Sequence, residues 1–428
     1  MSIEATRLDQ PSAPVIANVK VGKLRLWICV VTFLAYMVAF FDRANVAVLI
    51  ADNAFTNAFG ITEDKSVQGL LLTAFLFFYG AACFFAGPFV HRFGPRNTLG
   101  FALAFWAVLM TVMGSISSVA VLLVCRALLG LGESVLGPST SKLVQAWFPV
   151  HERAKANGAW YMGIQLSQML SMPLIAWCIA LFGWRESLFM LAVAGAVPVL
   201  LCFRFVYNSP SLHPRITKEE VAYITAGREG EVAEERAGRF SFVRNQDFWL
   251  IALIYACLNA GFWGFMGWVP TYFKATLGFS FTTMGVLSAL PYVAGAISII
   301  VVPPLMDKFN SRAAFVMIGC LGFAVLLFVA MYATTPAMCV ALLCLAQVFL
   351  SPAIVGVWTV LQNVTKSTEV ANATGFFNGV AYVFASAFPY AMGALYSFTG
   401  NLQNGFFLLA ALMAVAVFSS LPLIKRRL

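Results

Sequence analysis

Long apolar runs separated by short polar breaks are the main pattern of this chain. Each run is about 20 residues long, which is the length that an α-helix needs to cross the hydrocarbon core of a bilayer. We count twelve runs and predict a membrane-spanning helix for each. The predicted spans are residues 26–50, 67–90, 97–115, 118–141, 156–180, 187–207, 247–273, 282–305, 313–334, 337–362, 371–396 and 403–423.

The longest polar break, residues 208–246, divides the twelve runs into two sets of six. The pattern therefore predicts an all-α membrane protein of twelve transmembrane helices in two six-helix bundles. The expected parts are an N-terminal tail (1–25), a first bundle (26–207), a central loop (208–246), a second bundle (247–423) and a C-terminal tail (424–428).

The composition agrees with a membrane protein and excludes an ordinary soluble domain. Hydrophobic residues make up 61% of the 428 residues and charged residues only 11%. The segment before Lys20 is polar and lacks the short apolar core of a cleavable signal peptide, so we expect the first run to remain as a helix. The nine cysteines are scattered without ligand-like spacing, so we expect no metal, no disulfide and no cofactor.

The net charge of +9 is explained by the orientation of the protein in the membrane and not by a nucleic acid partner, as the positions of the basic residues indicate. If the N-terminus is cytoplasmic, only Lys65, Arg185 and Lys274 fall in outer loops. Two of the 27 basic residues lie well inside spans, and the other 22 fall at the inner face, as the positive-inside rule requires. We therefore expect a multi-pass protein of a bacterial-type inner membrane, with both termini and the central loop in the cytoplasm.

Four charged residues lie well inside predicted spans, namely Asp42, Arg43, Arg126 and Glu133. Each costs about 2.5–3.5 kcal/mol in hydrocarbon on insertion scales, so such residues usually face a bundle interior or a watery cavity. All four belong to the first six spans. The first half is therefore the place to look for a functional site.

The two charged residues of the fourth span share one helix face. Seven residues turn a helix through about 700°, which brings Glu133 back above Arg126 at a rise of about 10 Å. This separation is too large for a direct hydrogen bond, so another group should lie between them. Gly130 and Gly137 on the same face would let a neighbouring helix or a ligand come close.

Two interpretations of the buried charges stay open. One is a structural ion-pair network that locks residues 40–45 of the first span against the fourth, although such pairs are costly to desolvate. The other is a site where a carboxylate exchanges its arginine for a proton, which frees the arginine to hold an anion.

Other function classes have less support in the sequence. A membrane-embedded enzyme is disfavoured because the three histidines (91, 151 and 213) lie in inner loops and no nucleophile with a base falls within a span. We therefore predict that the protein is not an enzyme. A channel or a receptor without transport is the remaining alternative.

Two loops at equivalent positions of the halves look alike, GPFVHRFGPRN (87–97) and PPLMDKFNSR (303–312). Both resemble the cytoplasmic loop motif of the major facilitator superfamily, and the alternative is that they are only basic turns of the inner face. The motif positions are Gly87, His91, Arg92, Gly94 and Arg96 in the first copy and Asp307, Lys308 and Arg312 in the second. His91 replaces the motif's aspartate, which puts the gating latch of that loop in doubt, while Asp307 keeps it.

Within that superfamily, three features resemble the anion:cation symporter family. They are the pair Asp42-Arg43, the Arg126 to Glu133 spacing and the stretch AWFPVHERAKANG (146–158). The resemblance implies the pseudo-symmetric major facilitator fold, and uptake of a small organic anion together with protons by alternating access. It also implies a protein that works as a monomer in the lipid bilayer.

The resemblance also implies roles for individual residues. Asp42 and Glu133 would carry protons, Arg43 would grip the substrate carboxylate, and Arg126 would be the charge that answers Glu133. The further substrate-binding candidates are Tyr79, Gln165 and Asn378, with Asn259, Trp358, Gln362 and Ser386 carrying weaker signals. For each of these the alternative is an interhelical hydrogen bond. Two interpretations of the aromatic string FWGFMGW (262–268) stay open, stacking on a ring of the substrate or filling the core, and filling the core is the favoured one.

The identity of the anion stays open between two classes. The scattered Asn and Gln residues favour a hydroxylated sugar acid, because each hydroxyl needs a hydrogen-bond partner. The 14% of aromatic residues make a benzoate- or phthalate-like acid the second candidate.

Overall fold

The structure, a computed structural model, describes residues 22–228, 241–309, 311–365 and 369–426. Within these residues twelve helical segments are long and apolar enough to cross a membrane, as the sequence predicts. They are α1 (Leu26–Ala51), α3 (Lys65–Phe93), α4 (Pro95–Ser115), α5 (Val119–Glu133) continued by α6 (Leu136–Trp147), α7 (Arg153–Phe182), α8 (Trp184–Phe205), α10 (Gln246–Ala275), α11 (Phe281–Phe309), α12 (Arg312–Ala330), α13 (Pro336–Val364), α14 (Val370–Thr399) and α15 (Gln403–Lys425). Two short helices in loops, α2 (Asn53–Ala58) and α9 (Lys218–Ala226), were not predicted.

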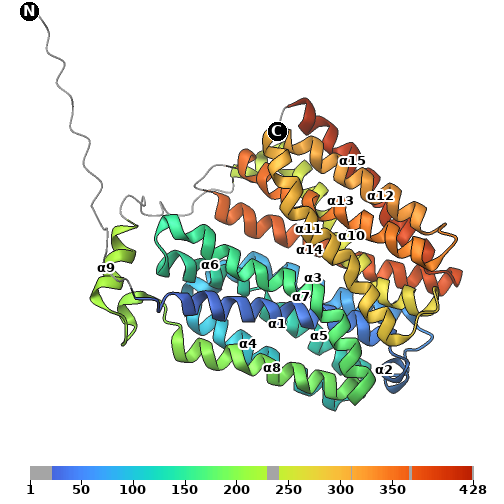
Figure 1. Ribbon diagram of the computed structural model, residues 1–428, viewed down its shortest axis with the longest axis horizontal. Helices are drawn as coiled ribbons and strands as arrows, with labels where there is room; N and C mark the ends of the chain where they lie inside the picture. The colour runs from blue at the N-terminus through green and yellow to red at the C-terminus, as the bar shows by residue number, and fades with distance from the viewer. Residues whose placement is uncertain (1–21, 229–240, 310, 366–368, 427–428) are drawn as a thin grey trace, which may run out of the picture.

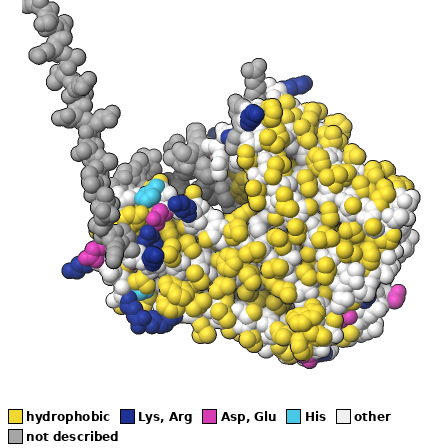
Figure 2. Space-filling view, viewed as in Figure 1, with side chains coloured by type: hydrophobic (Ala, Val, Ile, Leu, Met, Phe, Trp, Pro, Cys, Tyr) yellow, Lys and Arg dark blue, Asp and Glu magenta, His cyan; other side chains and the backbone are white. Residues whose placement is uncertain are grey.

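The helix ends define two faces of the molecule. The start of α1, the end of α15 and α9 lie at one face, here called the terminal face, and α2 lies at the opposite one, called the loop face (Figure 1). Figure 2 shows a broad apolar surface between them, with Lys and Arg gathered at the end that carries α9. Phe85, Ile300 and Phe398 are more than 70% exposed. Such apolar exposure suits contact with lipid.

The helices pack as two bundles that meet along three pairs. Helices α1 to α8 pack mainly among themselves, and so do α10 to α15, while α3 meets α14, α7 meets α11 and α1 meets α10. Small residues allow close approach at these seams. A Cβ on Gly69 of α3 would meet the carbonyl of Pro389 of α14, and one on Gly285 of α11 would lie 3.1 Å from the carbonyl oxygen of Met172 of α7.

The two bundles are closed against each other at the loop face. Lys274 Nζ donates to the carbonyl oxygen of Ala51 at 2.7 Å, and the hydroxyl oxygens of Ser66 and Ser397 lie 3.3 Å apart. Toward the terminal face the ribbons of the bundles diverge (Figure 1). The halves are therefore joined at the loop face, while α3 and α14 stay in contact further toward the terminal face, where the ring centres of Phe84 and Phe376 lie 5.2 Å apart.

Helix α9 of the central loop is fastened to the first bundle. Arg25 Nε donates to Glu152 at 2.9 Å, and Arg25 Nη1 donates to Glu220 of α9 at 3.3 Å. Tyr223 of α9 donates its hydroxyl to Glu152 at 2.9 Å. Parts of the predicted tails and central loop, residues 1–21, 229–240 and 427–428, lie outside the described residues.

The fourth span is not the continuous helix that residues 118–141 predicted. Helix α5 ends at Glu133, a turn follows at Ser134 and Val135, and α6 begins at Leu136. Pro138 explains the break, because it has no N–H to donate to the carbonyl of Ser134 and its ring crowds that carbonyl. The break places Glu133 at a helix end inside the bundle.

We expect a disulfide between the bundles in the variant that combines Ser66→Cys and Ser397→Cys. The two hydroxyl oxygens are in contact, so two thiols there should be close enough to join. With a protease site introduced within residues 229–240, the oxidised and cleaved protein should keep full-length mobility on a non-reducing gel. Ser66→Cys with Ser115→Cys is the matched control, because both lie in the first bundle and the halves should then separate. Separation of the first variant would contradict closure at the loop face.

Candidate functional site

The four buried charges form two ion pairs that cross between α1 and α5. Arg43 Nε donates to Glu133 Oε2 at 2.8 Å, and Arg126 Nη1 donates to Asp42 Oδ2 at 3.1 Å. The prediction that Arg126 answers Glu133 is therefore wrong. Two helical turns separate those residues on α5, so each reaches its partner on α1 instead.

The four side chains, called the quartet, are almost fully removed from solvent. Their exposed fractions are 0% for Asp42, 5% for Arg43, 1% for Arg126 and 3% for Glu133. Their formal charges sum to zero, which limits the cost of burying them. Removing any one of them would leave a buried charge without its partner, which is far more costly than the pair itself.

Several polar atoms of the quartet are uncommitted. Asp42 Oδ1, Arg126 Nη2 and Glu133 Oε1 are buried and have no hydrogen-bond partner among the described residues. Among the described residues, Arg43 makes one hydrogen bond, which its Nε donates to Glu133. Its two terminal nitrogens therefore stay available. A guanidinium with two available donors can accept a carboxylate in a forked arrangement.

Aromatic rings surround the Arg43 guanidinium. Its Cζ lies 4.6 Å from the ring centre of Phe40, 4.8 Å from Tyr79, 5.2 Å from Phe75 and 5.6 Å from Trp263. These four rings are called the aromatic cage. They attract the cation through their π faces and hold it in place without neutralising it. Trp263 comes from α10, so the cage joins the two bundles.

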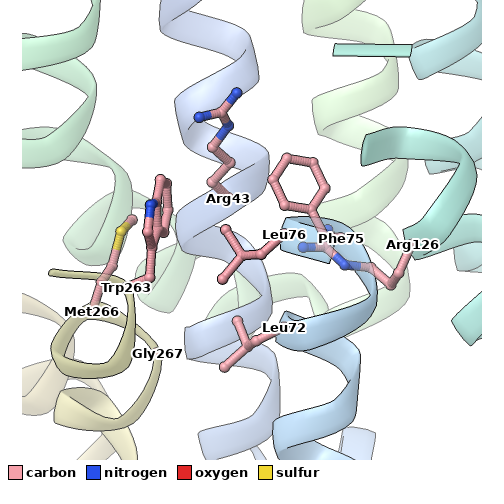
Figure 3. A pocket seen from close by; sticks show the side chains of 8 residues that line it. All are labelled: Arg43, Leu72, Phe75, Leu76, Arg126, Trp263, Met266 and Gly267. Atoms are coloured by element: carbon pink, nitrogen blue, oxygen red, sulfur yellow. The ribbon is translucent and has the colours of Figure 1, made fainter. Parts of the chain in front are cut away.

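A small cavity of about 10 Å³ lies between the two arginines and α10. Figure 3 shows Arg43 on α1, Arg126 on α5 and Trp263 on α10 around it, with Leu72, Phe75 and Leu76 of α3 in between. The Phe75 ring lies within cation–π distance of both guanidinium groups, since the Arg126 Cζ is 4.8 Å from its centre. The group between the two charged levels of the site is therefore an aromatic ring.

A cavity of about 380 Å³ lies between the two bundles on the terminal side of the cage. Its size is in the range of small-molecule sites. It is lined by Phe40, Tyr161, Ile164, Gln165, Gln168, Tyr255, Asn259, Phe262, Trp263, Ile299, Ser351, Ile354, Val355, Trp358 and Tyr382. Because Phe40 and Trp263 contact both this cavity and Arg43, the cage forms the boundary between the cavity and the quartet.

Three of the predicted substrate-binding residues line this cavity, namely Gln165, Asn259 and Trp358. Gln165 comes from the first bundle and the other two from the second, so the cavity is shared. Asn259 also donates its side-chain N–H to the carbonyl of Tyr255 at 2.9 Å, which leaves its amide oxygen for a ligand.

The other predicted residues lie elsewhere. Tyr79 belongs to the cage, and the Asn378 amide oxygen accepts a hydrogen bond from Tyr255 at 3.1 Å, which is the interhelical alternative. Gln362 is exposed near the end of α13 and does not line the cavity. Ser386 is buried and donates to the carbonyl of Val383 at 2.7 Å.

Apart from Trp358, the aromatic residues of the cavity lining were not predicted to bind substrate. Trp263 belongs to the string that was expected to fill the core, yet it faces both the cavity and Arg43. Phe40 precedes Arg43 by three residues, which is the spacing of side chains on one helix face, so its place could have been inferred. Nothing in the sequence pattern marks Tyr382, which reaches the site from α14.

The loop-motif residues lie at the terminal face. Gly94 has a φ of +80°, a value that favours glycine, and Arg96 Nη2 donates to the carbonyl of Phe203 at 2.7 Å. The first copy thus ties α4 to α8 within one bundle. The other positions are placed as follows: Gly87, His91 and Arg92 in α3, Lys308 exposed in α11, and Arg312 at the start of α12, 3.5 Å from Asn363. The side chain of Asp307 lies outside the described part, so its gating role stays a prediction.

Comparisons with known proteins show which family the chain belongs to. The sequence profile of the Major Facilitator Superfamily matches residues 32–389 and 272–427. A probable sulfoacetate transporter of Cupriavidus necator is 27% identical, over 93% of this chain and 94% of its own length. The hexuronate transporter of Bacillus subtilis is 25% identical, over 94% of this chain and 95% of its own.

A solved structure shares the fold. A bacterial homologue of the human lysosomal transporter Spinster, in an inward-facing and unoccupied conformation, matches with a TM-score of 0.79 at 16% identity, over 96% of this chain and 98% of that one. The named relatives are transporters, as the prediction of a protein that is not an enzyme requires. The fold and the profile match together show that this chain belongs to the major facilitator superfamily.

Proposed function

We propose that this protein is a secondary active transporter that imports a small organic anion together with protons by alternating access. One observation carries the proposal: Arg43 is paired through its Nε alone, and it stands at the boundary of a cavity shared by both bundles. The named relatives transport organic anions, which supports the same class of substrate here.

Arg43 is the proposed anchor for the substrate carboxylate. Its terminal nitrogens are uncommitted, and the cage rings that hold it also line the cavity. Arg126 is less suited to this role, because it is 1% exposed and does not line the larger cavity. Arg126 would instead hold Asp42 in place.

Glu133 and Asp42 are the proposed proton carriers. When Glu133 binds a proton it loses its charge, and its hold on Arg43 weakens. The arginine can then bind the substrate carboxylate, and the loaded protein turns to the other face. There Glu133 releases its proton, recovers its charge and competes for Arg43, which expels the substrate. Asp42 and Arg126 would repeat this exchange one level further from the cavity.

The membrane voltage adds to the driving force only if the transported charge is positive overall. One net charge is worth about 2.3 kcal/mol per 100 mV. One proton with one monovalent anion is neutral, and two protons make the step voltage-dependent. The presence of two carboxylates in the quartet permits either stoichiometry.

The terminal face is the proposed cytoplasmic face of an inner membrane. The positive-inside rule supports it, since Lys and Arg gather at the end that carries α9 (Figure 2). With that orientation the structure is closed toward the outside and has its cavity on the cytoplasmic side. We expect the protein to work as a monomer, with rocking of the two bundles about the quartet.

A sugar acid is the favoured substrate class. Gln165, Gln168, Asn259 and Ser351 supply the cavity with amide and hydroxyl groups from both bundles. These groups can donate to and accept from hydroxyls of the cargo. The hexuronate transporter among the relatives points to the same class.

An aromatic carboxylate is the second candidate, and the aromatic residues of the cavity lining support it. Seven of the lining side chains are aromatic: Phe40, Tyr161, Tyr255, Phe262, Trp263, Trp358 and Tyr382. Rings at such positions stack on an aromatic acid. A thermal-shift screen of sugar acids against benzoate and phthalate decides between the two classes, because the bound class should raise the melting temperature.

Arg43→Ala should weaken binding of the transported anion about 30-fold or more, because loss of a buried charged partner costs about 2–5 kcal/mol. Arg43→Lys keeps the charge but loses the fork and should recover only part of the affinity. Isothermal titration of the acid found in the thermal-shift screen measures both. Unchanged affinity in Arg43→Ala would show that the anchor is elsewhere.

Glu133→Gln should abolish accumulation driven by a pH gradient while substrate exchange continues, because the amide imitates the protonated acid. Uptake into proteoliposomes with and without an imposed gradient measures the first property, and counterflow measures the second. Asp42→Asn should lose gradient-driven accumulation as well. Full gradient-driven uptake by both variants would remove the proton role from the quartet.

A further inference from the structure

A second pair of polar side chains, Tyr36 of α1 and Thr140 of α6, lies on the terminal side of the quartet. Tyr36 precedes Arg43 by seven residues, about two turns of α1, so it lies on the same helix face about 10 Å nearer the terminal face. Thr140 lies beyond the break that follows Glu133, so its position is given by its neighbour Tyr36 and not by helical spacing. The Tyr36 and Thr140 hydroxyls lie close together.

Gly137 lies between these two levels and has open space beside it. A Cβ on Gly137 would have the Tyr36 hydroxyl oxygen at 3.7 Å as its one near contact in the described part, apart from its own helix. The space beside Gly130 of α5 is occupied instead, since a Cβ there would meet the backbone of Phe75. The space beside Gly137, bounded by Tyr36 and Thr140, is called the Gly137 slot.

Two polar atoms without partners belong to residues close to Gly137 along the chain. Glu133 Oε1, four residues before Gly137, and Thr140 Oγ1, three residues after it, are buried and have no hydrogen-bond partner among the described residues. Buried polar atoms are normally satisfied by protein or by ordered water. The lining of the slot is therefore of the kind that holds water.

The lower end of the slot leads toward the terminal face. The Tyr36 ring stacks on Trp160, with ring centres 4.6 Å apart and planes 25° from parallel. Trp160 is half-buried near the start of α7, and its indole N–H donates to Asn157 at 3.1 Å. Neither Tyr36 nor Thr140 is among the residues that line the larger cavity.

We propose that the Gly137 slot is the path by which Glu133 exchanges its proton with water at the terminal face. The proton leaves the Glu133 carboxyl for water in the slot. The Tyr36 hydroxyl then accepts a proton from this water and donates its own proton to water at the terminal face, so Tyr36 is unchanged. The charged groups that face Glu133 are Arg43 and Asp42 of α1 and Arg126 of α5. This inference rests on the proposed proton role of Glu133.

A path through the Gly137 slot allows Glu133 to release its proton before the substrate has left. Glu133 is 3% exposed, and Arg43 with its cage stands between it and the larger cavity. A bound carboxylate on Arg43 would close that side completely. A separate path lets Glu133 lose its proton while the substrate is still bound, which is the step that expels it.

Infrared spectroscopy of the full-length protein after a pH jump tests the path without any substrate. The carbonyl band of protonated Glu133 is identified by its absence in Glu133→Gln. We expect Tyr36→Phe and Gly137→Ala to slow the change of this band about tenfold or more, as loss of a positioned proton-transfer group does. Its midpoint pH should stay the same. Tyr36→Phe keeps the ring that stacks on Trp160, and an Ala Cβ fits the slot at ordinary contact distance.

Two matched variants serve as controls. Tyr292→Phe removes another buried tyrosine hydroxyl that lacks a partner in the described part, on α11, and Gly158→Ala adds a methyl group at an open position of α7. Both should keep the wild-type rate. Wild-type rates in Tyr36→Phe and Gly137→Ala, or equal slowing in the controls, would overturn the slot as the path. A wild-type protein with no Glu133 band at any pH would overturn the proton role itself.

Discussion

The crossed ion pairs between α1 and α5 are the constraint on which the rest of the site depends. Two acids and two bases are buried within the membrane-spanning part of one bundle, and they are tolerable there only because each has its partner. In the proposed mechanism a proton on Glu133 and a carboxylate on Arg43 satisfy this requirement from opposite sides, so that the binding of one favours the binding of the other.

The aromatic cage changes what the arginine can do. A guanidinium held only by carboxylates would be neutralised by them. The π faces of aromatic rings also hold the cation, but they leave its charge available to a further anion. Because Phe40, Tyr79 and Phe75 come from the first bundle and Trp263 from the second, the contact with Arg43 depends on how the bundles are placed. Any movement of one bundle relative to the other would therefore alter the surroundings of Arg43, the proposed anion anchor.

The sequence predicted those features that follow from the free-energy cost of placing a charged or polar group in hydrocarbon. Burying Asp42 or Arg126 in hydrocarbon is expensive enough to stand out against any apolar background, and twelve spans follow from run length alone. It did not predict the pairing, because helical spacing says which residues share a face but not which face of a neighbour they meet. Trp263 and Tyr382 were missed for a related reason: an aromatic ring can face lipid, the core or a cavity, so its sequence position does not tell which of these it faces. The break after Glu133 could have been read from Pro138, whose missing N–H acts one turn earlier.

The attachment of α9 to Arg25 and Glu152 has a consequence for how the two bundles are held together. These contacts tie α9 to the first bundle, so any change in the placement of the two bundles would carry α9 along with the first one. The contacts that hold the bundles together lie elsewhere, where α3 meets α14, α7 meets α11 and α1 meets α10.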